Sequence, residues 1–176
     1  MCLLKGDKGS KWRLKGNVKF RKRKMLSERG RKMDFSTCGK EIRKFDQVNR
    51  MAIPPSFREK LGTTVYILKS IHEEPCLLLM SEDSWQAFNE KFTSKLSGTQ
   101  LIAAQRWLAN RVDKASVDKS GRITIGDEFK EYANLAEDVY VVGIMNRVEL
   151  WNYDAWVEIT SGYSEASFDL SVMDYN

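Results

Sequence analysis

The sequence has little of what metal sites, disulfide frameworks and most active sites require. It contains a single histidine and three cysteines. Cys2, Cys38 and Cys76 are widely spaced, and no CxxC pair occurs. A structural zinc site needs four ligands at short paired spacings, and a disulfide framework carries an even set of cysteines. We therefore expect three reduced cysteines in a cytosolic protein, and no metal.

Catalytic motifs are absent as well. The sequence has no GxSxG, HExxH, GxxxxGK[ST] or GxGxxG motif, so nucleophilic, metal-dependent and nucleotide-dependent catalysis have no sequence support. The single histidine, His72, lies in the segment HEEP. That segment is typical of a hairpin turn, and we expect a solvated side chain rather than a general base. The sequence therefore indicates a protein that is not an enzyme and has no cofactor and no small-molecule substrate.

Long apolar runs are also missing. No stretch approaches the roughly 18 uncharged apolar residues that a membrane-spanning helix needs, so no membrane partner is expected. The chain has 176 residues, of which 42% are hydrophobic and 11% aromatic. This composition is sufficient to bury a core, either as one compact domain or as two small ones.

Basic charge is concentrated in the first part of the chain. Residues 1–32 hold 13 Lys and Arg against two acidic residues, a balance of +11, whereas residues 33–176 hold 16 against 22, a balance of −6. One interpretation is a nucleic-acid-binding arm built on KFRKRK. The other, which we favour because the composition changes sharply there, is a domain that begins near Met33. The preceding stretch is then an over-extended start or a dispensable tail.

A repeat is the most informative feature of the sequence. Residues 41–62 and 113–134 share an apolar residue, an Asp, three further residues and an Arg, followed by an apolar–x–Ile alternation and a short amphipathic segment. The matched pairs are Phe45/Val117, Asp46/Asp118, Arg50/Arg122, Met51/Ile123, Ile53/Ile125, Phe57/Phe129 and Glu59/Glu131. After each block follow two strand-like segments and a helix that contains Trp85 or Trp156. The chain thus carries two copies of one supersecondary unit.

Each DxxxR motif is predicted to form a turn between two short strands. Asp46 and Asp118 open the turns, where a carboxylate accepts hydrogen bonds from backbone N–H groups two or more residues on. Arg50 and Arg122 lie on the exit side. Such a pair has two interpretations that the residues alone leave open. It locks the hairpin, or it holds a guanidinium ready for a phosphate or a guanine edge, and one pair can do both.

Backbone chemistry supports the turns and the elements that follow them. Gly121 is suited to a positive φ in the second turn, and Asn49 is the next most tolerant residue at that place in the first. Pro54 and Pro55 are expected to begin a helix that ends near Gly62. Residues 82–110 are expected to form two helical segments that break at Ser97–Gly98, with apolar stripes that pack mainly into the core and in part at a subunit interface.

These residues carry a family resemblance. The segment IRKFDQVNRMAIPPSFREKLG resembles the swapped-hairpin DNA-binding segment of AbrB-type bacterial transition-state regulators. The segment VDKSGRITIGDEFKEYANLAEDVYVVGIMNRVELWNYDAWVE is similar to the second repeat of the MraZ family. The likeness covers roughly residues 36–158. It implies an α+β fold, in which a tandem pseudo-twofold repeat of swapped-hairpin AbrB-like units forms a double-psi-like β-barrel with flanking helices.

The resemblance also divides the chain. We expect a basic, disordered extension, a first repeat, a connecting helix, a second repeat and a flexible acidic tail. Their boundaries are residues 1–34, 35–92, 93–110, 111–159 and 160–176 respectively.

The function that the resemblance implies is sequence-specific DNA binding by a transcriptional regulator. Family members form ring homo-oligomers whose DxxxR loops line one face and bind direct repeats in promoter DNA, often repressing their own division and cell-wall operon. The expected partners are double-stranded promoter DNA and further copies of the chain, in the cytoplasm and at the nucleoid. The alternative is an antitoxin-like or protein-interaction module that uses the same AbrB-type fold.

The resemblance assigns eight DNA-binding residues. The signature positions are those of the two DxxxR motifs, three further basic positions match residues that contact DNA in the AbrB-like half, and one lysine lies inside the second loop, within reach of phosphate. In that order they are Asp46, Arg50, Asp118 and Arg122; Arg43, Lys44 and Arg58; and Lys119. Two departures stand out, because Asn49 replaces the usual loop glycine and Gly126 the usual proline. They put in doubt the geometry of the first loop and the rigidity with which the second helix starts.

Overall fold

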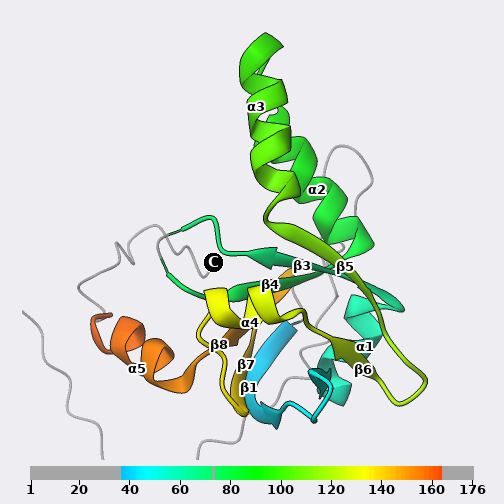
Figure 1. The fold of residues 1–176 in the computed structure, drawn as a ribbon, viewed down its shortest axis with the longest axis vertical. Coiled ribbons are helices and arrows are strands. Elements are labelled where there is room, and N and C mark those ends of the chain that lie inside the picture. The colour runs from blue at the N-terminus through cyan, green and yellow to red at the C-terminus, as the bar shows by residue number, and fades with distance from the viewer. Residues whose placement is uncertain (1–36, 73, 164–176) are drawn as a thin grey trace, which may run out of the picture. The chain divides into compact units, whose positions relative to one another are not determined.

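The computed structural model describes residues 37–72 and 74–163. The first half contains β1 (Thr37–Lys44), β2 (Arg50–Ala52), α1 (Pro55–Leu61), β3 (Thr64–Lys69), β4 (Leu77–Ser81) and α2 (Glu82–Thr93). The second half contains α3 (Gly98–Ala109), β5 (Val112–Ser116), β6 (Arg122–Thr124), α4 (Asp127–Tyr132), β7 (Asp138–Met145), β8 (Arg147–Trp151) and α5 (Tyr153–Ser161) (Figure 1). The expected basic extension and most of the expected acidic tail lie outside the described residues.

The strands form two antiparallel sheets that combine both halves of the chain. The larger sheet has the order β1-β7-β8-β4-β3-β5, and β2 pairs with β6 in a separate two-stranded sheet. Exchanging the two halves maps β1 onto β5, β7 onto β3 and β8 onto β4, so the strand order is symmetric. The first strand of each half pairs with a strand of the other half, since β1 pairs with β7 and β5 with β3. The expected mixed α+β architecture is therefore confirmed.

The sheets are open rather than closed. Within the described ranges 37–72 and 74–163, the strand pairs end at β1 on one edge of the larger sheet and at β5 on the other. The two-stranded sheet of β2 and β6 is not joined to it by a ladder. The strand pairings thus do not show the closed double-psi-like barrel that the resemblance implies. On its other side β2 has only one isolated bridge, between Phe45 and Met51, which is too little to extend the ladder.

The short helices begin and end where the turn chemistry predicts. Pro54 is the N-cap of α1. Gly62 ends that helix with a φ of 76°, a left-handed conformation that glycine adopts at little energetic cost. Phe57 and Leu61, four residues apart, are the buried side chains of α1. In the second half α4 ends at Tyr132 with Ala133 as its C-cap, and the following Asn134 has a φ of 48°. Both halves therefore place one short amphipathic helix directly after the DxxxR turn and its strand.

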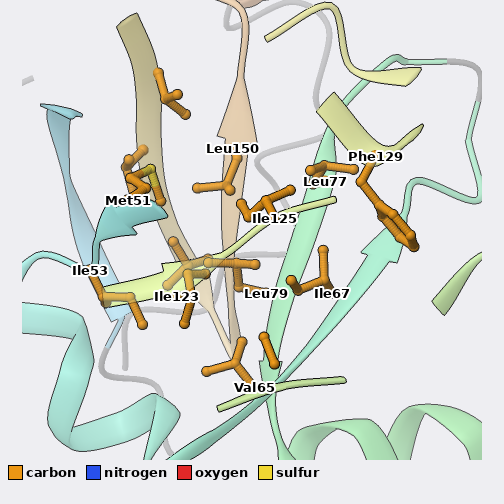
Figure 2. Packing of buried hydrophobic residues seen from close by; sticks show 14 of the residues in the cluster. Met51, Ile53, Val65, Ile67, Leu77, Leu79, Ile123, Ile125, Phe129 and Leu150 are labelled. Carbon is orange, nitrogen blue, oxygen red and sulfur yellow. The ribbon is translucent and has the colours of Figure 1, made fainter. Parts of the chain in front are cut away.

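The main core lies between the two-stranded sheet and the larger sheet. Met51, Ile53, Ile123 and Ile125, on and just after β2 and β6, are at most 1% exposed. Figure 2 shows these side chains packed with residues of β3, β4 and β8, including Val65, Ile67, Leu77, Leu79 and Leu150. The predicted alternation in both segments is confirmed, since every second residue is buried. Both halves contribute to one core, so neither half has a complete core alone.

The helical pair α2–α3 differs in part from its expected packing. A row of stacked aromatic rings runs from Tyr66 of β3 through Trp85, Phe88 and Phe92 of α2 to Trp107 of α3, with centroid separations between 5.2 and 6.0 Å. No residue of α2 is fully buried, and α3 buries only Leu108. In Figure 1 α3 extends away from the sheets, whereas α2 lies against β3 and β4. The stripe of α2 packs against a second core cluster, as expected, although its side chains are only partly buried. The stripe of α3 differs from the expectation, because Leu108 is its only buried side chain.

Apolar surface therefore remains on α3. Ile102 is 49% exposed and Trp107 is 43% exposed. Neither helix resembles a membrane span, since the described part of the chain has no helix that is both long and apolar enough to cross a bilayer.

Removal of the shared core should destabilise the whole described fold. We expect Ile125→Ala to lower the free energy of unfolding by about 2–5 kcal/mol, because Ile125 is fully buried at the junction of both halves. Val157→Ala, on an α5 side chain that is 44% exposed, is the matched control and should change stability by less than about 0.5 kcal/mol. Denaturant unfolding followed by circular dichroism measures both. Equal losses in the two variants would contradict the shared-core assignment.

Candidate nucleic-acid interface

The first DxxxR motif forms a turn in which a single carboxylate orders both the backbone and the arginine. Asp46 Oδ1 accepts hydrogen bonds from the backbone N–H groups of Val48 (3.0 Å) and Arg50 (2.9 Å). Its other oxygen, Oδ2, accepts from Arg50 Nε at 2.7 Å. The backbone closes the turn, since the Asp46 N–H donates to the Arg50 carbonyl at 2.8 Å. Asn49 takes the left-handed conformation, with a φ of 59°.

The second motif repeats this geometry. Asp118 Oδ1 accepts from the backbone N–H groups of Ser120 (2.8 Å) and Arg122 (2.9 Å), and Oδ2 accepts from Arg122 Nε at 2.8 Å. Gly121 occupies the left-handed position, with a φ of 75°. The replacement of the usual loop glycine by Asn49 therefore leaves the first turn in the same conformation as the second. Asparagine tolerates this conformation better than most residues.

The Asp–Arg pairs lock the hairpins and still leave the guanidinium groups accessible. The Arg50 side chain is 39% exposed and the Arg122 side chain 35%. Both aspartate pKa values lie below their usual range, first because the backbone N–H of the arginine donates to the carboxylate and then because of its guanidinium, while burial acts in the opposite direction. The carboxylates are consequently ionised near neutral pH, and each holds its arginine in place. The structure therefore contains the Asp–Arg contact that the first interpretation, a locked hairpin, requires.

The two loops flank the small sheet. Arg50 is the first residue of β2 and Arg122 the first residue of β6. Because these strands are antiparallel, with Arg50 opposite Thr124 and Arg122 opposite Ala52, the loops lie at opposite ends of the same two-stranded unit. Each end of the small sheet therefore carries one aspartate-held arginine.

The two basic residues at the end of β1 are less available than the resemblance implies. Arg43 is paired with Glu41, two residues before it on the same strand. Lys44 Nζ lies 3.1 Å from Glu137 Oε1 and 3.3 Å from Asp138 Oδ1. Its pKa is raised by these contacts, with the hydrogen bond to Glu137 as the largest cause. Nearby carboxylates thus offset much of the positive charge at this end of the sheet.

Arg58 and Lys119 have different surroundings. Lys119 is exposed within the second loop. Arg58 Nε donates to the Ile53 carbonyl at 2.8 Å, and its guanidinium lies directly against Gly121, where an added Cβ would approach Arg58 Cζ to 2.1 Å. Gly121 is therefore required for close approach as well as for its positive φ.

Sequence reasoning missed one basic residue beside the first loop. Lys130, in α4, donates from Nζ to Asn49 Oδ1 at 2.6 Å and lies 4.5 Å from the centre of the Phe45 ring. The repeat held a signal for it, because Lys130 follows Phe129 as Arg58 follows Phe57. Gly126, the second departure from the family pattern, is the N-cap of α4, and that helix still begins at Asp127.

The aspartates should resist protonation. We expect Asp46 and Asp118 to titrate below the usual aspartate range, so the turns should stay intact as the pH falls until it reaches these lowered pKa values. Arg50→Ala should raise the pKa of Asp46 only part of the way, because the backbone N–H donor remains, and should leave that of Asp118 unchanged. Carboxyl-carbon NMR titration measures both values. An Asp46 pKa in the usual range in the unsubstituted chain would contradict the geometry.

Comparison with known proteins places the chain in a family. The family model described as "MraZ protein, putative antitoxin-like" matches residues 39–105 and 111–172. A protein of Clostridium tetani named "Transcriptional regulator MraZ" is 30% identical over 125 residues, covering 70% of this chain and 84% of that protein.

Further relatives carry the same name. The protein of Bifidobacterium longum is 33% identical over 133 residues, with 72% of this chain and 87% of that protein covered. The protein of Caldanaerobacter subterraneus is 33% identical over 125 residues, with coverages of 70% and 85%. The family model matches well over half of the chain, in two segments that correspond to the two repeats. The chain therefore belongs to the MraZ family.

Proposed function

We propose that this chain is a DNA-binding transcriptional regulator rather than an enzyme, and that its two DxxxR loops contact the DNA. The observation that carries the proposal is the pair of aspartate-held, half-exposed arginines, Arg50 and Arg122, at the two ends of one small sheet. The names of the relatives, which are transcriptional regulators, support the same conclusion.

Held arginines suit this role for an energetic reason. A guanidinium matches the O6 and N7 acceptors of guanine and the oxygens of phosphate with two parallel N–H donors. Arg50 and Arg122 each donate to an aspartate through Nε, which fixes the side chain before DNA arrives. Less rotamer entropy is then lost on binding. The negative charge of each aspartate would itself repel phosphate. Its contribution to binding is therefore to hold the arginine in place.

The net charge of the protein bears on how many copies DNA binding needs. Residues 33–176 carry a net charge of −6, but charges farther away than about 10 Å are largely screened at ordinary salt. The local field of the loops therefore matters more than the net charge. Arg43 and Lys44 are paired with carboxylates, so a single copy should bind weakly. High affinity requires several copies that contact successive DNA repeats.

Self-association is the second part of the proposal. The partner surface is the side of α3 that carries Ile102, which is 49% exposed. A ring of copies would present one pair of loops per chain to direct repeats in a promoter. We extend the proposal to repression of the chain's own division and cell-wall operon, in the cytoplasm and at the nucleoid, as the family resemblance implies.

Loss of both arginines should remove DNA binding. We expect Arg50→Ala with Arg122→Ala to weaken binding to the promoter DNA of its own gene by at least about 30-fold, since each bidentate contact is worth about 1–3 kcal/mol. Lys91→Ala, on an exposed residue of α2, removes a positive charge away from both the loops and the α3 surface and should leave affinity nearly unchanged. Gel-shift titration at several salt concentrations measures this. The logarithm of affinity should fall with that of salt by about 0.9 per phosphate contacted.

Two outcomes would count against the DNA assignment. Unchanged affinity in the double variant would remove the loops as the binding site. If the unsubstituted chain fails to retard promoter DNA near physiological salt, the second candidate function gains support. That candidate is an antitoxin-like or protein-interaction module, and the description of the matching family model favours it.

The association surface has its own test. We expect Ile102→Glu to dissociate the oligomer, because a charge would replace an exposed apolar side chain in the interface. Gln100→Glu adds the same charge on the same helix, at an exposed position on the opposite side from Ile102, and serves as the control. Native mass spectrometry reports the number of copies in each assembly. An unchanged assembly in the Ile102 variant would exclude this part of α3 from the interface.

A further inference from the structure

Each DxxxR loop is attached to the opposite half of the chain through its backbone. The carbonyl of Asn49, in the first loop, accepts from the N–H of Ile125 at 3.0 Å. In the second loop the carbonyl of Gly121 accepts from the N–H of Ile53 at 2.9 Å. Asn49 and Gly121 are the two left-handed residues of the turns. The residue that sets the conformation of each turn is therefore bonded to the strand end of the other repeat.

Two side chains also connect each loop to the other half of the chain. Arg58 of α1, in the first half, lies against Gly121 of the second loop. Lys130 of α4, in the second half, donates to the side chain of Asn49 in the first loop. Both basic residues directly follow the buried phenylalanine of their helix. We call these two contacts, Arg58–Gly121 and Lys130–Asn49, the cross-brace.

The two contacts of the cross-brace differ in chemistry. Gly121 has no side chain, so the Arg58 guanidinium fills that space and is fixed by its bond to the Ile53 carbonyl. In the first loop the amide of Asn49 is held at both ends, because Lys130 Nζ donates to Oδ1 at 2.6 Å and Nδ2 donates to Asp127 Oδ1 at 2.5 Å. The first loop is thus positioned by a polar chain of three residues and the second by close packing.

We propose that Lys130 and Arg58 are positioning residues for DNA binding, each acting on the loop of the other repeat. Lys130 holds the loop of Arg50 through Asn49, and Arg58 holds the loop of Arg122 through Gly121. The proposal rests on the proposed function, in which these two arginines contact DNA. It gives Arg58 a supporting role in place of direct DNA contact, and it assigns Lys130, which neither the motif nor the family resemblance indicated.

The cross-brace has a consequence for recognition. Each turn is ordered locally by its aspartate, but its placement relative to the other turn depends on contacts between the halves. A fixed separation between Arg50 and Arg122 lets both meet one stretch of DNA without further adjustment. Loss of one contact should therefore loosen one loop and leave the other in place.

Hydrogen exchange tests this directly on the full chain. Lys130→Met removes the donor to Asn49 and keeps most of the side chain, so amide exchange should speed up in residues 45–52 and stay unchanged in residues 117–124. Arg58→Met should show the reverse pattern. Lys130→Arg retains a donor and a cation, and should restore protection. Lys91→Met, on an exposed residue of α2, controls for the loss of charge. Mass spectrometry of peptides spanning the two loops provides the measurement.

DNA affinity gives the second readout. We expect Lys130→Met to weaken promoter binding about tenfold, within the range for coupled neighbouring residues, with an unchanged slope against salt. Equal exchange in both loops, or no change in the first, would overturn the cross-brace. A salt slope reduced by about 0.9 would show a direct phosphate contact and overturn the positioning role. If the exchange pattern is found but the unsubstituted chain does not bind DNA, the cross-brace holds and the proposed function fails.

Discussion

The pairing of strands from opposite halves is the constraint on which the rest of this structure depends. β2 and β6 are three residues long, too short to be stable as separate hairpins. Their pairing places Met51 and Ile123 opposite each other, and both are completely buried or nearly so. The same exchange places β1 beside β7 and β5 beside β3. The hydrophobic core is thus one shared structure, and the two loops that leave the small sheet are tied to it and to each other.

In the candidate site, the Asp–Arg pairs depend on neighbouring residues, whereas the relative placement of the two loops depends on strand pairing between the halves. Each Asp–Arg pair spans four residues and forms in both repeats with nearly the same distances, so the motif orders itself. The orientation of one loop to the other depends on backbone bonds to Ile53 and Ile125 in the opposite half. The ion pairs divide in the same way. The aspartates hold arginines four residues away, whereas the charge of Lys44 is offset by Glu137 and Asp138 of the opposite half.

The structure presents two surfaces of different chemistry. The loops offer half-exposed guanidinium groups held by carboxylates, which suits a polar and charged ligand. The α2–α3 pair offers apolar side chains, of which Ile102 and Trp107 are the most exposed on α3, which suits another protein surface. In the function that we propose, this separation would allow one chain to contact DNA and its own copies at the same time, as multivalent binding requires.

The sequence by itself determined the features that depend on near neighbours. The repeat, the two DxxxR turns, the left-handed conformations of Asn49 and Gly121, and the buried alternation at Ile53 and Ile125 were all predictable, since turn chemistry and a period of two act over a few residues. The start of α1 after Pro54 and its end at Gly62 follow for the same reason.

Tertiary structure decided what depends on distant residues. Open sheets took the place of the expected closed barrel, and Ile102 and Trp107 of α3 remained exposed. Lys44 meets Glu137 across 93 positions and Lys130 meets Asn49 across 81. No local pattern specifies such contacts, because they arise only when long-range strand pairing brings the two halves together.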